Sequence, residues 1–502
     1  MAISNPGAGH SGATGELNSV PASKKATLSS NYIDFTAAGT QGWAQQYLPD
    51  LMEGEAEVFG NRTIAGFLSQ VGAEEAMTSD QVIWSEQGRL HLSYTGTITG
   101  NTGVFIITND IDGNTVAAGE DGVRINDIVI IATAEGVIKC NVTARTANDR
   151  FTAMPYEDAL ISDTAAFGTG SVAATCLVVG SEFGKGVAGQ GGTASTTDGF
   201  GTVKPTHTSF TNKPIIIKDY YEVSGSDTSQ IGWVEISGEE GQNGYLWYLK
   251  AEGDTRARFS DYLEMSMLES VKAVAAGNHA ADAGQGGLTA GNTIGTEGLF
   301  AAIETRGNIT TGVTGVNAAT DLAEFDAILA EFDNQGAIEE NMMFVNRATS
   351  LAMDDMLASM NSYGAGGTSY GVFNNSEDMA LNLGFSGFRR GSYDFYKSDF
   401  RYLNDKATRG SINSRAAGFG VRGVIVPAGV STVYDQTLGR NLKRPFLHVR
   451  YRASQMEDRK LKTWITGSVG GNITSDLDAM QVHYLSERCL ITQGANNFML
   501  MK

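Results

Sequence analysis

One long amphipathic segment limits what this chain can fold into more than any other feature. Between residues 254 and 276, apolar side chains recur every three or four positions, as on one face of an α-helix. Asp254 is placed to cap its start and Gly277 to end it. A helix of about six turns must lay such a face on a sheet or on another helix. The members of the face are Phe259, Tyr262, Leu263, Met267, Val271, Val274 and Ala275.

Segments with strand character lie on both sides of this helical segment. From about residue 80 to 160, runs of Val, Ile, Thr and Phe alternate with Gly, Asp and Asn turns, which predicts a small antiparallel barrel or sandwich. Residues 1–50 are rich in Gly, Ser, Ala and Asn without periodicity, so we expect an extended arm. Helices are predicted over 321–336 and 347–364, before strands return near the C-terminus. The fold class expected is therefore α+β.

Charge is distributed unevenly along the chain. The formal net charge of −20 argues against a surface that binds nucleic acid throughout. Residues 385–462 nevertheless contain sixteen basic and six acidic side chains, a net of +10, so the remainder carries −30. This separation lets a positive surface of one copy attract a negative surface of another. A solvated basic face without a partner is the alternative interpretation.

The cysteines and the apolar runs indicate the kind of compartment. Cys140, Cys176 and Cys489 are odd in number and far apart, which predicts buried free thiols rather than disulfides. No stretch of 18 apolar residues occurs, and the first residues lack the pattern of a secretory signal. We therefore expect a soluble protein of a reducing compartment that does not contact a membrane.

Three short motifs imitate functional sites but fail on their context. Gly184–Gly189 matches G-x-G-x-x-G, yet a glycine-rich stretch and not a helix follows it. Gly367–Gly371 matches G-x-S-x-G, but it lacks the preceding strand and the following helix of a nucleophile elbow. Asp110–Asn114 resembles the start of a calcium loop, but its glycine stands at the fourth position instead of the sixth. We expect a hairpin turn there.

The histidines add no site, because none of the six is paired with another at helical ligand spacing. The sequence thus predicts no catalytic residue, no metal site and no cofactor. On these grounds we do not expect the protein to be an enzyme.

Three stretches carry a resemblance to a known family. "NKPIIIKDYYEVSGSDTSQIGW" precedes the predicted helix, and "GLFAAIETRGN" follows it. Near the end, "ITGSVGGNITSDLDAMQVHYLSERCLITQGANN" places Asp478 before a strand that carries Glu487. Over about residues 212–502, these stretches resemble the major capsid proteins of tailed bacteriophages, which have the Hong Kong 97-type fold.

The resemblance implies a Hong Kong 97-like capsid fold with an N-terminal arm, an E-loop, a peripheral domain with a long spine helix, and an axial domain. Residues 80–200 exceed what a plain E-loop needs, so an inserted β-rich subdomain is expected. The implied boundaries are an arm at 1–50, an E-loop region at 51–215 with the insert at about 80–160, a peripheral domain at 216–300 with spine helix 254–276, an axial domain at 301–425, and return strands of the peripheral domain at 426–502.

The implied function is structural. Proteins of this family self-assemble, as hexamers and pentamers, into an icosahedral shell around the double-stranded DNA genome of the phage. The implied partners are further copies of the chain, separate scaffolding, portal and decoration proteins, and packaged DNA contacted only non-specifically. The implied location is the virion capsid, assembled in the cytoplasm of the bacterial host. The alternatives are an encapsulin-type compartment shell and a β-rich phage decoration or tail protein.

The basic segment supplies candidate contact residues between subunits. We expect Arg389, Arg390, Arg401 and Arg409 to contact acidic residues of an adjacent subunit. If the segment faces the lumen instead, its basic side chains would contact packaged DNA, and DNA retention would then depend on salt.

Overall fold

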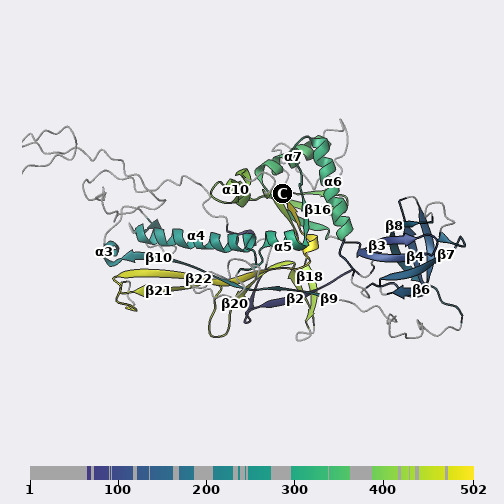
Figure 1. Cartoon of the computed structure of the whole chain (residues 1–502). Coiled ribbons are helices and arrows are strands. Elements are labelled where there is room, and N and C mark those ends of the chain that lie inside the picture. The colour runs from purple at the N-terminus through teal and green to yellow at the C-terminus, as the bar shows by residue number, and fades with distance from the viewer. Residues whose placement is uncertain are drawn as a thin grey trace, which may run out of the picture. The chain divides into compact units, whose positions relative to one another are not determined.

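A computed structural model describes most of the chain. The described residues are 65–68, 73–89, 91, 93–116, 121–134, 136–147, 149–161, 169–185, 207–229, 236–237, 243–244, 247–272, 295–336, 338–361, 387–415, 420–428, 430–435, 440–469 and 473–502. The chain divides into two compact units (Figure 1). The first unit combines Met1–Ile83 with Thr211–Lys502, and the second is Trp84–Phe210.

The second unit contains a closed barrel of six antiparallel strands in the order β3-β4-β7-β6-β5-β8. Alternate side chains point inward and build a separate core, which includes Phe105, Val129 and Phe151. The strands are β3 (Ser93–Thr99), β4 (Val104–Asp110), β5 (Asp127–Ala132), β6 (Val137–Ala147), β7 (Arg150–Pro155) and β8 (Ser171–Ser181).

The predicted barrel or sandwich is thus a barrel, but it is longer than the expected 80–160. Strand β8 follows residue 160, and it closes the barrel by pairing with both β3 and β5. Without β8, two strand edges would remain open, so the chain must continue beyond residue 160 before the barrel is complete.

A buried ion pair lies inside the barrel unit. Arg145 donates to Asp121 through Nη1 at 2.5 Å and Nη2 at 2.8 Å, and Nη1 also donates to the carbonyl oxygen of Val123 at 2.5 Å. The hydroxyl of Tyr94 accepts a hydrogen bond from the backbone N–H of Gly122 at 2.7 Å, and burial raises the pKa of this tyrosine. These bonds tie the segment before β5 to strands β3 and β6.

The motif-like stretches behave as expected where the structure describes them. In Asp110–Asn114 the N–H of Asp110 donates to the carbonyl of Asn114 at 2.9 Å, and Gly113 has a φ of +84°. The predicted hairpin turn is confirmed, and Asp121, the twelfth position of the imitated calcium loop, pairs with Arg145 instead. Of the G-x-G-x-x-G match, residues 186–189 lie outside the described residues. The whole G-x-S-x-G match at 367–371 also lies outside them.

A two-stranded ribbon connects the chain to the barrel. Strand β2 (Val82–Gln87) leads into the barrel unit, and β9 (His207–Asn212), which pairs with β2, leads out of it. Within the ribbon, the rings of Trp84 and Phe210 lie 6.1 Å apart. The barrel is therefore inserted between two paired strands.

The first unit contains a five-stranded sheet in the order β1-β20-β22-β10, with β21 also paired to β22. The long β22 pairs with β10 along one edge, and with β21 and then β20 along the other. Strand β1 runs parallel to β20, so residues from both ends of the chain meet in this sheet, called here the large sheet. Its strands are β1 (Ala73–Met77), β10 (Ile215–Ser224), β20 (Leu447–Arg452), β21 (Lys462–Gly467) and β22 (Ala479–Thr492).

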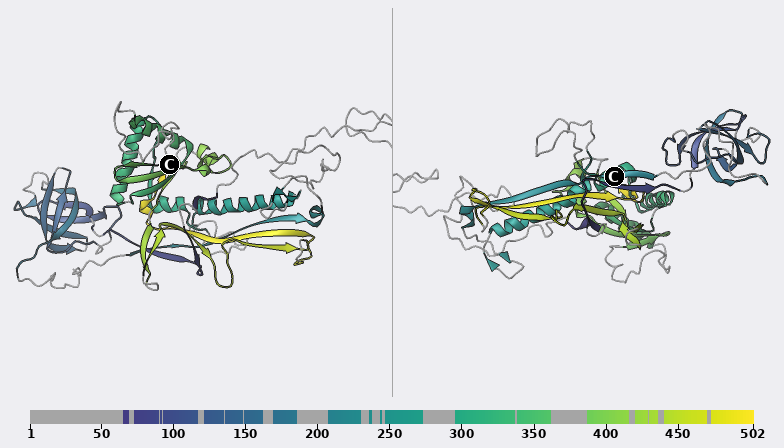
Figure 2. Two further views of the ribbon diagram at one scale, coloured as in Figure 1. Left: turned by 180° about the vertical axis from the view of Figure 1, so that it is seen from behind. Right: turned by 90° about the horizontal axis from the view of Figure 1, so that it is seen from below.

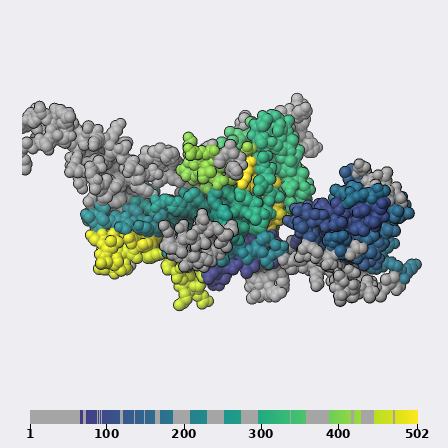
Figure 3. Space-filling model, viewed as in Figure 1, coloured from purple at the N-terminus to yellow at the C-terminus, as the bar shows by residue number. Residues whose placement is uncertain are grey.

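Helix α4 (Trp247–Glu269) lies along one face of the large sheet (Figures 1 and 2). Its buried Phe259, Leu263 and Met267 confirm most of the predicted apolar face, whereas Tyr262 is exposed. The ring of Phe259 lies 5.8 Å from that of Tyr484 on β22. In the space-filling view the teal helix follows the yellow C-terminal strands (Figure 3).

The bounds of this helix differ from the expected 254–276. Asp254 is not the cap but an interior residue, because burial of Ala251 and Thr255 extends the helix back to Trp247. At the other end the helix stops at Glu269, and Val271 is exposed. Residues 273–294, which include Val274, Ala275 and Gly277, lie outside the described residues.

A second sheet of the first unit has six strands in the order β13-β23-β17-β14-β16-β15. Helix α6 (Ala318–Gln335) begins at an Asn317 cap and ends at Gly336 with a φ of +66°, and α7 (Arg347–Asn361) follows β14. Both helices confirm the periodicity prediction, and the last three residues of the predicted 347–364 lie outside the described residues. The strands are β13 (Asn308–Thr310), β14 (Glu340–Val345), β15 (Gly387–Arg390), β16 (Tyr393–Asp399), β17 (Gly423–Pro427) and β23 (Met499–Met501).

Two strands depart from the expected domain boundaries. The expected E-loop region 51–215 contains β1, which belongs to the large sheet. The expected return segment 426–502 ends in β23, which belongs to the second sheet because Met499, Leu500 and Met501 are buried there between β13 and β17. Both departures arise from pairings between residues far apart in the sequence, which no local pattern reveals.

Short elements complete the described structure. The helical ones are α3 (Gly225–Thr228), α5 (Leu299–Arg306), α9 (Arg401–Asn404), α10 (Arg409–Arg415) and η4 (Ala495–Asn497). Two further strand pairs are β11 (Ile236–Ser237) with β12 (Asn243–Gly244), and β18 (Val430–Asp435) with β19 (Arg440–Pro445). Among the described helices, none has the length and apolar character needed to span a bilayer.

The three cysteines are buried free thiols, as predicted. Burial raises the pKa of each to about 12. Cys140 and Cys176 lie in the barrel core, whereas Cys489 lies on β22 of the large sheet.

Candidate subunit-contact surfaces

The structure places two of the four candidate arginines on β15. The Nε atom of Arg389 lies 3.5 Å from the carboxylate of Asp394, which faces it on the neighbouring strand β16. Arg390 donates two hydrogen bonds to the carboxylate of Asp326 on helix α6, at 2.5 Å from Nε and 2.7 Å from Nη2. Arg390 therefore joins the second sheet to a helix that packs on it.

The other two candidates lie on the short helices α9 and α10. Arg401 reaches Asp405, four residues along the chain, at 3.3 Å. Arg409 donates to Oε2 of Glu269 at 2.6 Å, and the hydroxyl of Tyr402 donates to Oε1 of the same carboxylate at 2.8 Å. Burial, with Glu269 as a second cause, raises the pKa of Tyr402. Glu269 is the last residue of α4, so Arg409 anchors α10 to the end of that helix.

All four candidates thus have an acidic partner within the same chain, and they do not form one cluster. Arg389 keeps the largest exposed fraction, 53% of its side chain, against 18% for Arg409. Charge at Arg389 is the most accessible to a neighbouring subunit, since an exposed pair is easily exchanged for another. The contact between subunits stays a prediction for these residues.

Much of the +10 charge of residues 385–462 is neutralised in the same way. At least ten of its sixteen basic side chains form ion pairs within the chain. Their partners include Glu74, Asp80 and Asp354 from the acidic remainder. The basic side chains of residues 385–462 therefore pair mainly with acidic side chains of the same subunit. Less unpaired charge is then left to attract a neighbouring subunit.

A charged network at the β1 edge of the large sheet escaped the sequence analysis. The buried Glu487 on β22 lies 2.7 Å from Nε of Arg459 and 3.5 Å from Nη1 of Arg452. Glu75 on β1 lies 2.6 Å from Arg450 of β20. The Glu75–Arg450 pair holds the parallel edge strand β1 onto the sheet, where main-chain bonds are available from one side only. The two Glu487 pairs join β22 to the end of β20 and to the segment after it. The resemblance had singled out Glu487, but not its two partners, Arg452 at the end of β20 and Arg459 after it.

A second anchor holds the segment just before β1. The carboxylate of Glu264 on α4 accepts hydrogen bonds from the backbone N–H groups of Gly66 at 3.3 Å and Leu68 at 3.2 Å. Between them, the ring of Phe67 is buried, 4.7 Å from Phe344 and 4.9 Å from Phe400. Burial raises the pKa of Glu264. Residues 65–68 are therefore fixed to the end of the α4 helix and to the second sheet's core.

The face of the large sheet opposite α4 carries a row of aromatic rings across three strands. The three strands β10, β22 and β21 are seen in Figure 1. The ring of His483 on β22 lies 5.1 Å from Trp464 of β21 and 5.9 Å from Tyr220 of β10. The hydroxyl of Thr466 hydrogen-bonds to Nε2 of His483 at 2.7 Å. Since Tyr220 is exposed, this row is a surface on which another chain can pack.

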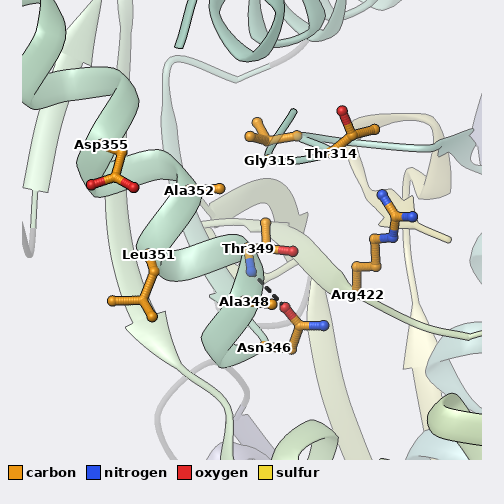
Figure 4. A pocket seen from close by; sticks show the side chains of 10 residues that line it. Thr314, Gly315, Asn346, Ala348, Thr349, Leu351, Ala352, Asp355 and Arg422 are labelled. Atoms are coloured by element: carbon orange, nitrogen blue, oxygen red, sulfur yellow. Dashed lines mark hydrogen bonds between the residues drawn. The ribbon is translucent and has the colours of Figure 1, made fainter. Parts of the chain in front are cut away.

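A hollow of about 400 Å³ lies between the start of α7 and the loop before α6 (Figure 4). Asn346 caps α7 there by accepting the N–H of Thr349 at 2.8 Å, and Asp355 and Arg422 contribute opposite charges to the lining. Its lining residues are Val313, Thr314, Gly315, Asn346, Ala348, Thr349, Leu351, Ala352, Asp355 and Arg422. Within the described part of the chain, no group of three or more His, Cys, Asp or Glu residues is placed to hold a metal ion.

Comparison with known proteins finds similarity only at the level of structure. No family model matches the sequence, and no curated protein matches it. Solved structures similar to the chain include one from Microbacterium phage Oxtober96, with 9% identity, a TM-score of 0.37, and coverage of 94% of this chain and 99% of that one. A second, the mature capsid of bacteriophage PhiM1, has 9% identity, a TM-score of 0.37, and coverage of 94% and 96%.

A third similar structure comes from Gordonia phage Cozz, with 10% identity, a TM-score of 0.36, and coverage of 97% of both chains. At such identities and TM-scores, the functional conclusion has to rest on the architecture of the chain itself.

Proposed function

We propose that this chain is the shell-forming subunit of a tailed-phage capsid. The observation that carries the proposal is the arrangement of the first unit: a long helix, α4, along a sheet whose strands come from both ends of the chain. Beside it, the unit holds a second sheet flanked by α6 and α7. Together with the sequence resemblance, this order supports a spine helix on a peripheral domain, followed by an axial domain.

The remaining parts fit the same proposal. The β2–β9 ribbon corresponds to an E-loop, and the barrel that it carries corresponds to an inserted subdomain. The segment at 65–68 corresponds to the base of an N-terminal arm, tied to α4 by Glu264. A shell subunit needs such extensions, because each copy must hold several neighbours through modest interfaces repeated many times.

The partners and the place of assembly follow from this role. The subunit would form hexamers and pentamers of a closed shell in the bacterial cytoplasm, with separate scaffolding, portal and decoration proteins. Packaged DNA would be contacted without sequence preference. In this role the protein binds and positions rather than catalyses.

Electron microscopy of the purified full-length chain, with sizing chromatography and with or without candidate scaffolding proteins, tests the proposal. Closed shells, tubes or rings of capsomers are the expected result. Only monomers or small oligomers under every condition would contradict it, and would favour a decoration or tail protein. Shells produced in the native host that enclose enzymes rather than DNA would favour the encapsulin-type alternative.

A further inference from the structure

The outer wall of the barrel bears an apolar patch that the barrel does not need for its own core. Four neighbouring strands, β8, β5, β6 and β7, contribute to it. Exposed fractions are 65% for Val137, 58% for Val179 and 41% for Leu177. We call this surface the barrel patch, and its members are Ile128, Ile130, Val137, Met154, Leu177 and Val179.

The strand register shows that these side chains are neighbours. Ile130 on β5 pairs with Leu177 of β8 on one side and with Lys139 of β6 on the other. In the next row, Ile128 pairs with Asn141, which in turn pairs with Met154 of β7. The patch therefore extends across four neighbouring strands, with Ile130 and Leu177 as direct cross-strand neighbours and the polar Lys139 and Asn141 between the other apolar members.

The other wall of the same barrel has a different composition. On β3 the corresponding outward positions are hydroxyl side chains, Ser93, Thr95, Thr97 and Thr99, as is usual for a wall that faces water. The barrel is closed, so no strand edge is left for another chain to extend. Any partner of the patch must therefore dock through side chains.

A positive charge lies within the patch and a negative charge lies at its border. Lys139 is exposed within the patch, beside Ile130. At its border, the hydroxyl of Tyr156 donates to the carboxylate of Glu182 at 2.7 Å, and Asn141 donates to the same hydroxyl at 3.3 Å. With a cation inside and an anion at the border, a copy rotated about a two-fold axis can place opposite charges together.

We propose that the barrel patch is a self-docking surface, on which the patch of a second copy of this chain packs about a two-fold axis. In that contact the aliphatic side chains lie against each other, and Lys139 of each copy approaches Glu182 of the other. The inference rests on the proposed function, because a shell of identical subunits supplies a second copy across two-fold axes between neighbours.

A charge exchange tests the pairing in full-length chains. Lys139→Glu and Glu182→Lys should each lower the fraction of barrel-to-barrel contacts about tenfold, because each places like charges together, and the double variant should restore it. Thr108→Glu, an exposed position on β4 outside the patch, is the matched control and should change nothing. If the double variant is no better than the single ones, the patch does not meet its own copy, and a separate protein such as a decoration protein is its partner.

The contacts are measured by crosslinking assembled particles that carry Leu177→Cys, with a short bis-maleimide, since the three native thiols are buried. Covalent dimers from Leu177→Cys, but not from Thr108→Cys, support the inference. Particles that form normally but give no dimer overturn it and leave the proposed function intact. Dimers without any particles would support the self-docking surface while contradicting the shell function.

Discussion

The barrel and the large sheet differ in where their strands come from along the chain and in whether their edges are open. In the barrel every strand comes from one continuous stretch, residues 93–181, and the sheet closes on itself. The large sheet draws its strands from residue 73 to residue 492, and it ends in open edges. Among its described residues the barrel has one fully buried ion pair, whereas the β1 edge of the large sheet has several partly exposed ones.

This difference predicts two kinds of stability. A barrel whose strands are close together in the sequence loses little loop-closure entropy on folding, so it can stay folded by itself. The large sheet depends on segments separated by hundreds of residues, and its edge pairs are weakened by salt. We therefore expect the large sheet to open before the barrel does.

Removing the buried arginine of the barrel should have the largest effect. Arg145→Ala leaves the carboxylate of Asp121 buried without its partner, which should lower the free energy of unfolding of the barrel by about 3–5 kcal/mol. Limited proteolysis and circular dichroism during urea unfolding measure this loss of stability. The stability of the large sheet should not change. Arg150→Ala, which removes the surface pair with Asp149, is the matched control and should have little effect. Equal losses for the two variants would show that burial does not determine how much an ion pair contributes to the free energy of unfolding.

In the large sheet, a smaller loss is expected from Glu487→Gln. The amide keeps the size of the side chain but removes the charge that Arg459 and Arg452 share, so the free energy of unfolding should fall by about 2 kcal/mol. Urea unfolding followed by hydrogen exchange of the peptides that contain β20, β21 and β22 measures this change. Glu457→Gln, at an exposed position next to the same arginine, is the control and should change little. A loss confined to the barrel would contradict the assignment of Glu487 to this sheet.

The native thiols measure the order of opening without any substitution. Burial raises the pKa of all three cysteines to about 12, so none should react with a thiol reagent near neutral pH in the folded protein. As urea increases, Cys489 of the large sheet should react before Cys140 and Cys176 of the barrel. Peptide mass spectrometry after brief labelling distinguishes them. Simultaneous reaction of all three would mean that the two regions unfold as one.

Sequence reasoning was most successful where a pattern is local. The spacing of Phe325, Ile328 and Phe332 predicted α6, and Gly336 ends it in the left-handed conformation that glycine adopts easily. The turn at Asp110–Asn114 followed equally from a few adjacent residues. The same reasoning placed the start of α4 at Asp254, and it was wrong there because the helix already begins at Trp247, about two turns earlier, and Ala251 of that extension is buried.

The candidate contact residues show the limit of charge counting. The excess of basic residues between 385 and 462 is visible in the sequence, yet Arg390 and Arg409 are already paired with Asp326 and Glu269 of the same chain. Those partners lie 64 and 140 residues away, and no linear pattern connects them. The hydrogen bonds that Glu264 accepts from the backbone of residues 66 and 68 were missed for the same reason.

By itself, the sequence determined the helices α6 and α7, the apolar face of α4, the strand-rich character of the barrel region and the buried state of the thiols. Each of these depends on periodicity or composition within a short window. Only the tertiary structure decided that β8 closes a barrel, that β1 joins the large sheet and that β23 joins the other one. Strand partners are selected by burial and hydrogen bonding between segments far apart in the chain, and those energies appear only when the segments meet.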